Sequence, residues 1–412
     1  MRKHFDIAII GAGPSGMAAA LEARLEGAGL RILLIEKNAE PGRKLRATGS
    51  GRCNISNEAA PGCREALDFL RRQGIAVRTY PNGLIYPYSE SASDVTELLA
   101  ARVREAGIGL WTESSVSYIY PVEYPGGTGY RVTIARKGTD PDVVDCRRLI
   151  VASGGKSGPN YGTTGDAYAM LRRLGHTLVR PIPVLTPVEC AEDGCEEVSG
   201  TRAKGVVTLI RHHQGFSEEV FSEAGEIQFT RFGLSGICVF NMTRHMRFSR
   251  DEGIESFEIR MDLCPDLDMT GFLRERRGQE QTFTGKDRIR AGLLLCSVLR
   301  EKLADYVLKR SGIDAGRPIA ELSDAELTRV ADNVHSLLFR PTGIRGWKEA
   351  QCTSGGIPLT EIDRDTCESK CCPGLYITGE LQDYDGPCGG FNLTHAWCTG
   401  MAAGRAAAES LR

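Results

Sequence analysis

Apolar residues at 7–10 precede closely spaced glycines, and an alanine-rich stretch with helical periodicity follows over 17–24. This succession of apolar and small residues predicts a buried strand, a tight turn and the start of a helix. A second strand pattern, 31–35, ends in Glu36, about twenty residues beyond Gly16. The spacing is that of a Rossmann-type βαβ unit, in which the acid binds the adenosine ribose of a dinucleotide.

The glycine-rich turn supplies the phosphate-binding geometry of this fold. Gly11 permits the turn, Gly13 lets the backbone approach a pyrophosphate, and Gly16 lets helix and strand pack closely. Exposed N–H groups and the helix dipole then favour the phosphate charge. The cofactor-binding residues expected in this part of the chain are Gly11, Gly13, Pro14, Ser15, Gly16, Glu36 and Lys37.

Apolar periodicity extends the fold beyond this unit. One helical face is apolar over 92–106. Strand patterns at 109–116, 130–135 and 147–152 continue the sheet, the first of them as a third parallel strand. Near the C-terminus a strand pattern over 374–381 and a final helix return to the same α/β character.

From about residue 187 the pattern changes to short β-rich runs separated by glycine or charge, which is typical of a small barrel or sandwich. These runs are 205–212, 218–221, 226–230, 236–242 and 256–262. A helical element follows, with an apolar stripe over 286–310 and a capping box, Ser323-Asp324-Ala325-Glu326, that opens a second helix.

With 412 residues, the chain is too long for one simple core. We therefore expect an α/β chain in which a Rossmann-type domain, 1–186 plus 346–412, is interrupted by an insert, 187–345. Within the insert, a small β-barrel is expected at about 187–270 and a helical element at about 285–340.

Composition narrows the classes of partner. Charged residues make up 25% of the chain and the formal net charge is −2, so neither a nucleic acid nor an anionic membrane is indicated. No apolar run approaches the roughly 18 residues of a membrane helix, and we expect a cytoplasmic protein with a small-molecule substrate. The sequence leaves the oligomeric state open.

The 14 cysteines give no metal-binding pattern. None forms Cys-x-x-Cys and no Cys/His spacing resembles a zinc site, so we expect no metal. Cys367 and the adjacent Cys371 and Cys372 are interpreted as reduced cysteines that act as small hydrophobes. His176 is interpreted as a packed or solvated side chain.

A loop rich in glycine, arginine and small polar residues follows Glu36. Its basic side chains suit the neutralisation of phosphates, and its glycines suit backbone that packs against a flat ligand. Gly42-Arg43-Lys44 and Ala47-Thr48-Gly49-Ser50-Gly51-Arg52-Cys53-Asn54 resemble the hallmark of a bacterial flavoprotein family, variously described as NAD(P)/FAD-dependent oxidoreductases, the aminoacetone oxidase family or 3-dehydro-bile acid Δ4,6-reductases. The resemblance implies a FAD-binding domain of the two-dinucleotide-binding type, with this loop along FAD. The contacts implied are Arg43, Lys44, Gly51, Arg52, Cys53 and Asn54.

Three further segments match the family pattern. Ala152-Ser153-Gly154-Gly155 resembles the Ala-Thr-Gly-Gly segment of such flavoproteins, and a P-loop is excluded because Ile150 stands where its first glycine belongs. The strand ending at Val116 is implied to hold adenine through its backbone. Residues 379–393 are implied to complete the FAD site, from the ribityl and phosphate chain to the pyrimidine end of the flavin. The FAD contacts implied are Val116, Ala152, Gly154, Gly379, Glu380, Gly390, Phe391, Asn392 and Leu393.

The insert resembles the insert domain of the same family, a barrel with a helical element over the flavin face. Residues 229–236 match a family segment that has histidine where Arg231 stands here. Arginine stays protonated near neutral pH, so proton chemistry by a histidine cannot be shared at this position.

The motifs together indicate the chemistry. A second Gly-x-Gly-x-x-Gly is absent from the sequence, so we expect FAD as the resident cofactor and NAD(P)H as a transient electron donor. We expect hydride transfer through flavin N5 to the β-carbon of an α,β-unsaturated ketone, while an acid protonates the α-carbon. Tyr86, Tyr88 and Tyr384 are the candidate acids. The resemblance implies a 3-oxo-Δ4,6 bile acid or steroid as the ketone.

Two alternatives stay open at the level of sequence. One is a flavin oxidase that uses O2 to oxidise a small amine or aminoketone. The other is a flavin-bearing interaction or RNA-associated protein with little turnover, which the net charge of −2 does not support.

Overall fold

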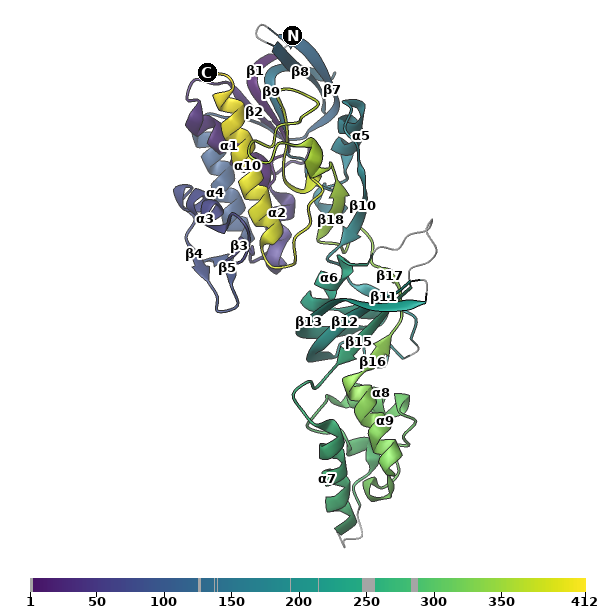
Figure 1. Cartoon of the computed structure of the whole chain (residues 1–412). Coiled ribbons are helices and arrows are strands. Elements are labelled where there is room, and N and C mark those ends of the chain that lie inside the picture. The colour runs from purple at the N-terminus through teal and green to yellow at the C-terminus, as the bar shows by residue number, and fades with distance from the viewer. Residues whose placement is uncertain are drawn as a thin grey trace. The chain divides into compact units, whose positions relative to one another are not determined.

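The computed structural model describes residues 3–124, 127–136, 138, 140–192, 194–213, 215–246, 256–282 and 288–412. The chain divides into two compact units, the first formed by 1–183 with 350–412 and the second by 184–349 (Figure 1). Among the described residues, no helix is both long and apolar enough to cross a lipid bilayer.

A parallel sheet forms the core of the first unit. Its strands are β1 (Lys3–Ile10), β2 (Ile32–Ile35), β6 (Gly109–Trp111), β9 (Asp142–Val151) and β19 (Leu375–Ile377). β1 lies between β2 and β9, β6 pairs with β2, and β19 pairs with the last residues of β9. All of β2 and the last four residues of β1 are buried, which explains their continuous apolar sequence. The predicted Rossmann-type fold is confirmed.

Two antiparallel strands, β8 (Gly127–Arg136) and β7 (Ser114–Tyr124), extend the same sheet beyond β9. The prediction of one parallel strand over 109–116 is therefore wrong in its second half. Glu113 adopts a positive φ of 49°, where the chain turns out of β6. Val116 consequently belongs to β7 and is paired with Ile134.

Two helices from opposite ends of the chain, α1 (Pro14–Glu26) and α10 (Phe391–Glu409), lie side by side (Figure 1). Gly400 and Gly404 are one helical turn apart on the face of α10 that meets α1. A Cβ atom at either glycine would lie 2.2 Å from a backbone oxygen, that of Ser15 or of Ala19. The lack of side chains at these two positions therefore lets the helix backbones touch.

Shorter elements complete the first unit. They are α2 (Arg43–Ala47), η1 (Thr48–Gly51), α3 (Cys63–Arg72), α4 (Ala92–Glu105), η2 (Pro159–Tyr161), α5 (Asp166–Arg173), η5 (Leu359–Glu361), η6 (Gly379–Leu381) and the small sheet of β3 (Ser56–Asn57), β5 (Leu84–Pro87) and β4 (Val77–Thr79). β10 (Val179–Val184) pairs with β18 (Cys352–Gly356), so the chain leaves and re-enters this unit through adjacent strands.

The second unit contains a seven-stranded antiparallel sheet in the order β16-β15-β12-β13-β14-β11-β17. The strands are β11 (Val188–Cys190), β12 (Arg202–His213), β13 (Phe216–Thr230), β14 (Gly233–Ser235), β15 (Ser256–Asp262), β16 (Leu337–Phe339) and β17 (Pro341–Ile344). The pairs among the described residues run as an open path from β16 to β17. Closure into the expected barrel stays a prediction.

One predicted strand of the second unit is a helix. Residues 236–242 form α6 (Ile237–Thr243) instead of a strand. Gly236 turns the chain with a φ of 118°, and its carbonyl accepts the Phe240 N–H, which starts the helix. An apolar run of this length does not distinguish a buried strand from a buried helix, so the sequence pattern was ambiguous here.

The helical element also differs in part. The helix expected over 286–310 is wrong before Glu301, because η3 (Ala291–Leu293) is followed by a turn in which Ser297 has a φ of 73°, and only then by α8 (Glu301–Arg310). Residues 286 and 287 lie outside the described part. α7 (Met269–Thr282) and η4 (Ile319–Glu321) were not predicted. α9 (Asp324–His335) confirms the predicted capping box, formed by Ser323 and Glu326.

Position 16 is expected to tolerate no side chain, whereas position 13 is expected to tolerate one. A Cβ at residue 16 would lie 1.8 Å from the Gly11 carbonyl oxygen, while a Cβ at residue 13 would meet nothing within 4 Å. We expect Gly16→Ala to lower the free energy of unfolding by about 3 kcal/mol, the upper range for overpacking, and Gly13→Ala to lower it by less than about 1 kcal/mol. Urea titration followed by far-UV circular dichroism measures both. Equal midpoints for the two variants would contradict the packing argument.

Candidate functional site

The segments predicted to bind FAD come together at one edge of the parallel sheet. β1, β2, β9 and β19 run in the same direction, so their carboxyl ends share the edge at which open α/β sheets bind nucleotides. The turn at 11–16 follows β1, Glu36 follows β2, Ala152 follows β9 and Gly379 follows β19. The sheet thus brings four segments that are distant in sequence to one place.

Glu36, the acid expected at the ribose, is buried, with 7% of its surface exposed. Its Oε2 accepts the Ala12 N–H at 2.9 Å, and its Oε1 accepts the backbone N–H and the side-chain amide of Asn38 at 2.8 and 2.7 Å. A carboxylate has about four acceptor positions, so one remains for a ribose hydroxyl. The carboxylate is therefore held rigidly beside the glycine turn.

Several buried polar atoms in these segments fit a bound dinucleotide. Asn54 Oδ1, Ser153 Oγ and His395 Nε2 are buried and have no hydrogen-bond partner among the described residues. Buried polar groups are normally hydrogen-bonded, so such atoms mark places where a ligand or water supplies the partner. The space beside Gly13 is open as well. The residues present thus fit a large polar ligand such as FAD.

Basic residues of the predicted flavin loop are paired with acids of the same unit. Lys44 forms an ion pair with Glu380 at 2.6 Å, which joins two segments implied to contact FAD. Arg52 forms an ion pair with Glu90 at 3.3 Å, and its guanidinium lies 4.9 Å from the centre of the Tyr86 ring. These pairs hold the loop in place between the sheet edge and the small sheet that contains Tyr86.

Lys37 and Arg43 are engaged in the same way. Lys37 forms an ion pair with Asp166 at the start of α5. Arg43 donates to the side-chain oxygen of Asn38 and to the Asn160 carbonyl, both at 3.1 Å. Since Asn38 also donates to Glu36, a chain of hydrogen bonds links the expected ribose acid to the loop. Direct contact of Lys37 or Arg43 with FAD stays a prediction.

Cys53 lies inside the loop and is fully buried, with a positive φ of 60°. Burial raises the pKa of its thiol to about 12, so the sulfur stays protonated near neutral pH and is a poor nucleophile. Gly51 is exposed, and a Cβ there would meet nothing within 4 Å. The loop thus combines an inert buried anchor with an open stretch of backbone.

The closing segment places backbone N–H groups at the N-terminus of α10. Gly390 caps the helix, and a Cβ there would lie 2.3 Å from the Ser56 carbonyl oxygen. Asn392 accepts the Gly386 N–H at 2.8 Å and donates to the Gly386 carbonyl at 2.9 Å, so its side chain holds its own loop together. Phe391 and Leu393 are half-buried. Their contacts with FAD stay predictions.

Val116 and Gly154 are the remaining implied FAD contacts. Val116 is nearly buried in β7, where the pairing with β8 is irregular between Val116 and Tyr118. Gly154 has a positive φ of 76°, and a Cβ there would lie 3.2 Å from Thr163. Neither observation tests a contact with adenine or flavin.

The structure separates the three candidate acids. Tyr86 is buried beside the flavin loop, and burial raises the pKa of its hydroxyl. Tyr88 is 60% exposed, with the Arg78 guanidinium 4.6 Å from its ring centre. Tyr384 is half-buried and stacks on His395, with ring centres 3.9 Å apart. The three rings therefore lie in a buried, an exposed and a stacked environment.

His395 is a candidate functional-site residue that the sequence pattern did not reveal. Its Nε2 atom is buried although part of the residue is accessible, and burial lowers its pKa to about 4. The ring is therefore neutral near pH 7. Because Tyr384 precedes α10 and His395 lies within it, only the fold reveals their stacking.

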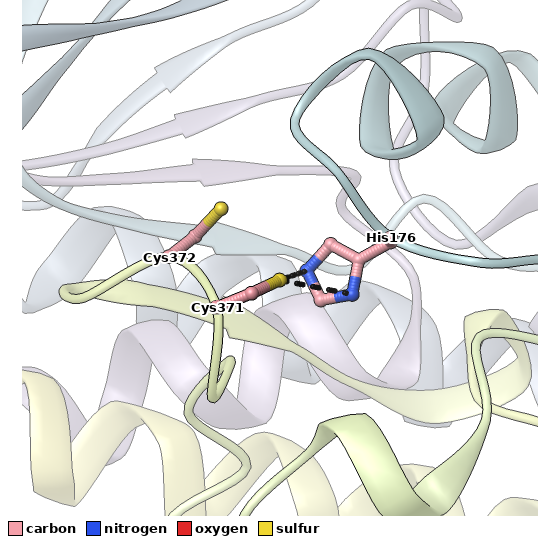
Figure 2. A group of neighbouring side chains, drawn as sticks. All are labelled: His176, Cys371 and Cys372. Atoms are coloured by element: carbon pink, nitrogen blue, oxygen red, sulfur yellow. Dashed lines mark hydrogen bonds between the residues drawn. The ribbon is translucent and has the colours of Figure 1, made fainter.

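The C-terminal cysteines are not equivalent. Cys367 is buried, but Cys371 is exposed, so the interpretation of Cys371 as a small hydrophobe is wrong. Its Sγ lies 3.5 Å from His176 Nε2, although 195 positions separate the two residues (Figure 2). His176 itself is buried, and both of its ring nitrogens have hydrogen-bond partners. No local spacing predicts this contact.

Glu36→Gln is expected to weaken FAD binding. The substitution keeps the size of the side chain but loses the charge that accepts the N–H groups and the ribose hydroxyl, and a hydrogen bond to a charged group contributes about 1.5–3 kcal/mol. We therefore expect the Kd for FAD to rise about tenfold to a hundredfold, measured by fluorescence titration of the flavin-free protein. Glu40→Gln, at an exposed acid four residues later, is the control. Unchanged affinity in Glu36→Gln would disprove the ribose assignment.

His395 is expected to destabilise the fold in acid. The unfolded chain takes up a proton on this ring near pH 6.5, whereas the folded protein does so only near pH 4, so stability falls as pH decreases between these values. The contribution is on the order of 3 kcal/mol in full. His395→Gln should show a smaller loss of urea midpoint between about pH 7 and pH 5 than the parent protein. The exposed His213→Gln is the control, and equal losses in all three proteins would contradict this assignment.

Comparisons with known proteins cover both units. A family model described as the HI0933-like protein Rossmann domain matches residues 5–65 and 62–406. The chain is 31% identical to the 3-dehydro-bile acid delta(4,6)-reductase of Clostridium scindens, over 98% of this chain and 99% of that protein. It is 28% identical to the ribosomal RNA dihydrouridine synthase of Escherichia coli, over 97% of each chain.

A solved structure shares the fold at low sequence identity. A flavocytochrome c3 fumarate reductase in an open conformation matches with a TM-score of 0.51 and 15% identity, over 99% of this chain and 78% of that one. The family match, the sheet edge that gathers the cofactor segments and the buried polar atoms without partners agree with one another. The chain belongs to the HI0933-like family and is an FAD-dependent oxidoreductase with a Rossmann-type FAD-binding domain.

Proposed function

We propose that the protein is an NAD(P)H-dependent reductase of a carbon–carbon double bond conjugated to a ketone, with a 3-oxo-Δ4,6 bile acid or a related steroid as substrate. The observation that carries the proposal is the 31% identity to a 3-dehydro-bile acid delta(4,6)-reductase, which extends over 98% of the chain. Because the match covers the second unit as well as the FAD-binding unit, it includes the part of the chain that we expect to shape the substrate site.

Reduction of such a ketone needs a hydride at the β-carbon and a proton at the α-carbon. FAD, when bound and reduced by NAD(P)H, would supply the hydride chemistry, while the protein would supply orientation and the proton. A tyrosine hydroxyl suits the proton donor, because it stays protonated near neutral pH.

Tyr384 is the tyrosine that the geometry favours as proton donor. It lies on the segment between η6 and α10, whose two ends carry implied FAD contacts, and its ring is held by stacking on His395. His395 is neutral near pH 7, so the ring that stacks on the Tyr384 phenol carries no positive charge. Tyr86 is buried next to the loop and suits a packing role. Tyr88 is exposed to solvent, and the Arg78 guanidinium lies over its ring. We assign proton donation to Tyr384.

Anaerobic mixing tests the reaction. NADH or NADPH is expected to bleach the flavin absorbance, and a 3-oxo-4,6-diene steroid is then expected to restore it with formation of a product two hydrogens heavier. Bleaching by neither nucleotide, or no reoxidation by the steroid, would disprove the proposal.

Tyr384→Phe tests the proton donor separately. The rate of steroid reduction should fall about 10²–10⁴-fold, the usual effect of losing a general acid, while the rate of bleaching by NAD(P)H stays unchanged. Tyr118→Phe, at an exposed tyrosine of β7, is the control. A similar steroid-reduction rate in both variants would exclude Tyr384 as the donor.

Reduction of uridine in ribosomal RNA is the second candidate. It rests on the 28% identity to a ribosomal RNA dihydrouridine synthase over 97% of the chain. Dihydrouridine is uridine with its carbonyl-conjugated ring double bond reduced, so it needs the same delivery of hydride and proton. A net charge of −2 gives little electrostatic attraction for RNA, which favours the small molecule. Dihydrouridine formation in ribosomal RNA, without steroid reduction, would reverse this order.

A flavin oxidase remains the third possibility from the sequence. Peroxide release in air from a small amine or aminoketone, at a rate above that of NAD(P)H-driven ketone reduction, would favour it.

A further inference from the structure

We propose that His176, Cys371 and Cys372 form a binding site for a soft divalent cation, with Zn²⁺ as the representative ion. Their potential ligand atoms all lie within 4.8 Å of one another (Figure 2). Cysteine sulfur and histidine nitrogen are the ligands that Zn²⁺ takes most often in proteins. No FAD contact implied by the sequence involves these three residues.

The ligand atoms are close enough to reach one cation after the cysteine side chains rotate. Cys371 Sγ lies 3.5 Å from His176 Nε2 and 3.7 Å from Nδ1, so without a cation the sulfur faces the imidazole ring and not the Nε2 lone pair. Bonds of about 2.3 Å to sulfur and 2.0–2.1 Å to nitrogen, at a tetrahedral angle, place these atoms about 3.5–3.6 Å apart. Coordination would require both cysteine side chains to rotate, and Cys372 Sγ would give up its hydrogen bond to the Leu174 carbonyl at 3.2 Å. Because Cys371 is exposed, the fourth position is accessible to water.

Glu361 and Ser369 orient the histidine for coordination. Glu361 Oε2 lies 2.7 Å from His176 Nδ1, and the Glu361 carboxylate also accepts the Thr177 N–H at 3.2 Å. A carboxylate at Nδ1 holds the ring proton there and leaves the Nε2 lone pair for a ligand, the usual support of a metal-binding histidine. The Ser369 hydroxyl accepts the Cys372 N–H at 2.9 Å and lies 2.9 Å from Nε2, where it donates to that lone pair. A bound cation takes the place of this donated proton.

A disulfide between Cys371 and Cys372 explains the cluster less well. Neighbouring Cα atoms are about 3.8 Å apart across a trans peptide, which is shorter than the roughly 4.4 Å lower limit of ordinary disulfides. A disulfide also gives no role to a buried histidine with a carboxylate behind it. A shared cation gives a role to the three ligands, His176, Cys371 and Cys372, and to Glu361 behind the histidine.

The cluster lies between two segments of the first unit that are distant in sequence. Cys371 and Cys372 precede β19, whereas Gly379 and Glu380 follow it, and three strand residues span about 10 Å. His176 lies just after α5. A cation here would link the end of α5 to the loop before β19, and would stabilise the first unit without contacting the flavin segments.

Zinc binding to the full-length, untagged, FAD-loaded protein tests the site. The protein is reduced, freed of metal by dialysis against a chelator, equilibrated with Zn²⁺ and measured by elemental analysis. We expect about one zinc per chain, a higher melting temperature with Zn²⁺, and protection of two thiols from a thiol reagent. Cys371→Ser, at an exposed position, should lose the bound zinc while keeping its FAD content. Cys296→Ser, at an exposed cysteine of the second unit, should keep the zinc.

Glu361→Gln separates orientation of the histidine from coordination. The substitution leaves all three ligands in place. The affinity of the variant for zinc should fall about tenfold to a hundredfold, the usual effect of removing a residue that supports a ligating histidine. Less than a stoichiometric amount of zinc in the parent protein, or full retention of zinc in Cys371→Ser, would overturn the proposal. Neither result depends on turnover, so the site is tested independently of the proposed reaction.

Discussion

Direct contact between backbones around α1 is the constraint on which the first unit depends. At its N-terminus α1 begins against the Gly11 carbonyl, and along its length it meets α10 at Gly400 and Gly404. Each of these contacts leaves no room for a Cβ atom. The helix is thereby fixed to the sheet on one side and to the last helix on the other, and the N–H groups at its start face the edge where the strands end.

The charged side chains around the expected FAD site are also held in place by contacts within the first unit. The basic residues implied to neutralise phosphate are paired with acids or amides of their own unit, Lys44 with Glu380, Arg52 with Glu90 and Arg43 with Asn38. Phosphate charge would therefore meet aligned N–H groups and preorganised ion pairs instead of isolated cations.

The sequence predicted those parts of the structure that local spacing determines. The glycines at 11, 13 and 16 and the acid at 36 report a βαβ unit because backbone approach and ribose binding require those residue types at that spacing. The Ser323 capping box predicted α9 for the same reason. Local patterns failed where tertiary contacts decide. The turn at Glu113, within 109–116, is one example. The helix α6 is another, because the apolar run at 236–242 suits either a strand or a helix.

For the candidate site, the sequence allowed predictions only about the cofactor-binding segments, and their contacts with FAD stay predictions. The implied FAD segments could be named because each carries a motif, whereas the Tyr384–His395 stack and the His176–Cys371 contact join residues that no motif connects. Pairs of this kind arise from the packing of α10 and of the loop before β19. They become visible only when the fold places those segments.

The pairing of α1 with α10 also affects how the first unit folds during synthesis. During synthesis the glycine turn emerges long before α10, so the face of α1 that receives Gly400 and Gly404 stays uncovered until α10 has been added. β19, which completes the sheet edge, is equally late. Folding of the first unit therefore depends on contacts of very long sequence separation and should be slow. A nascent chain that has not yet reached α10 has the glycine turn, but it lacks the segment implied to complete the FAD site.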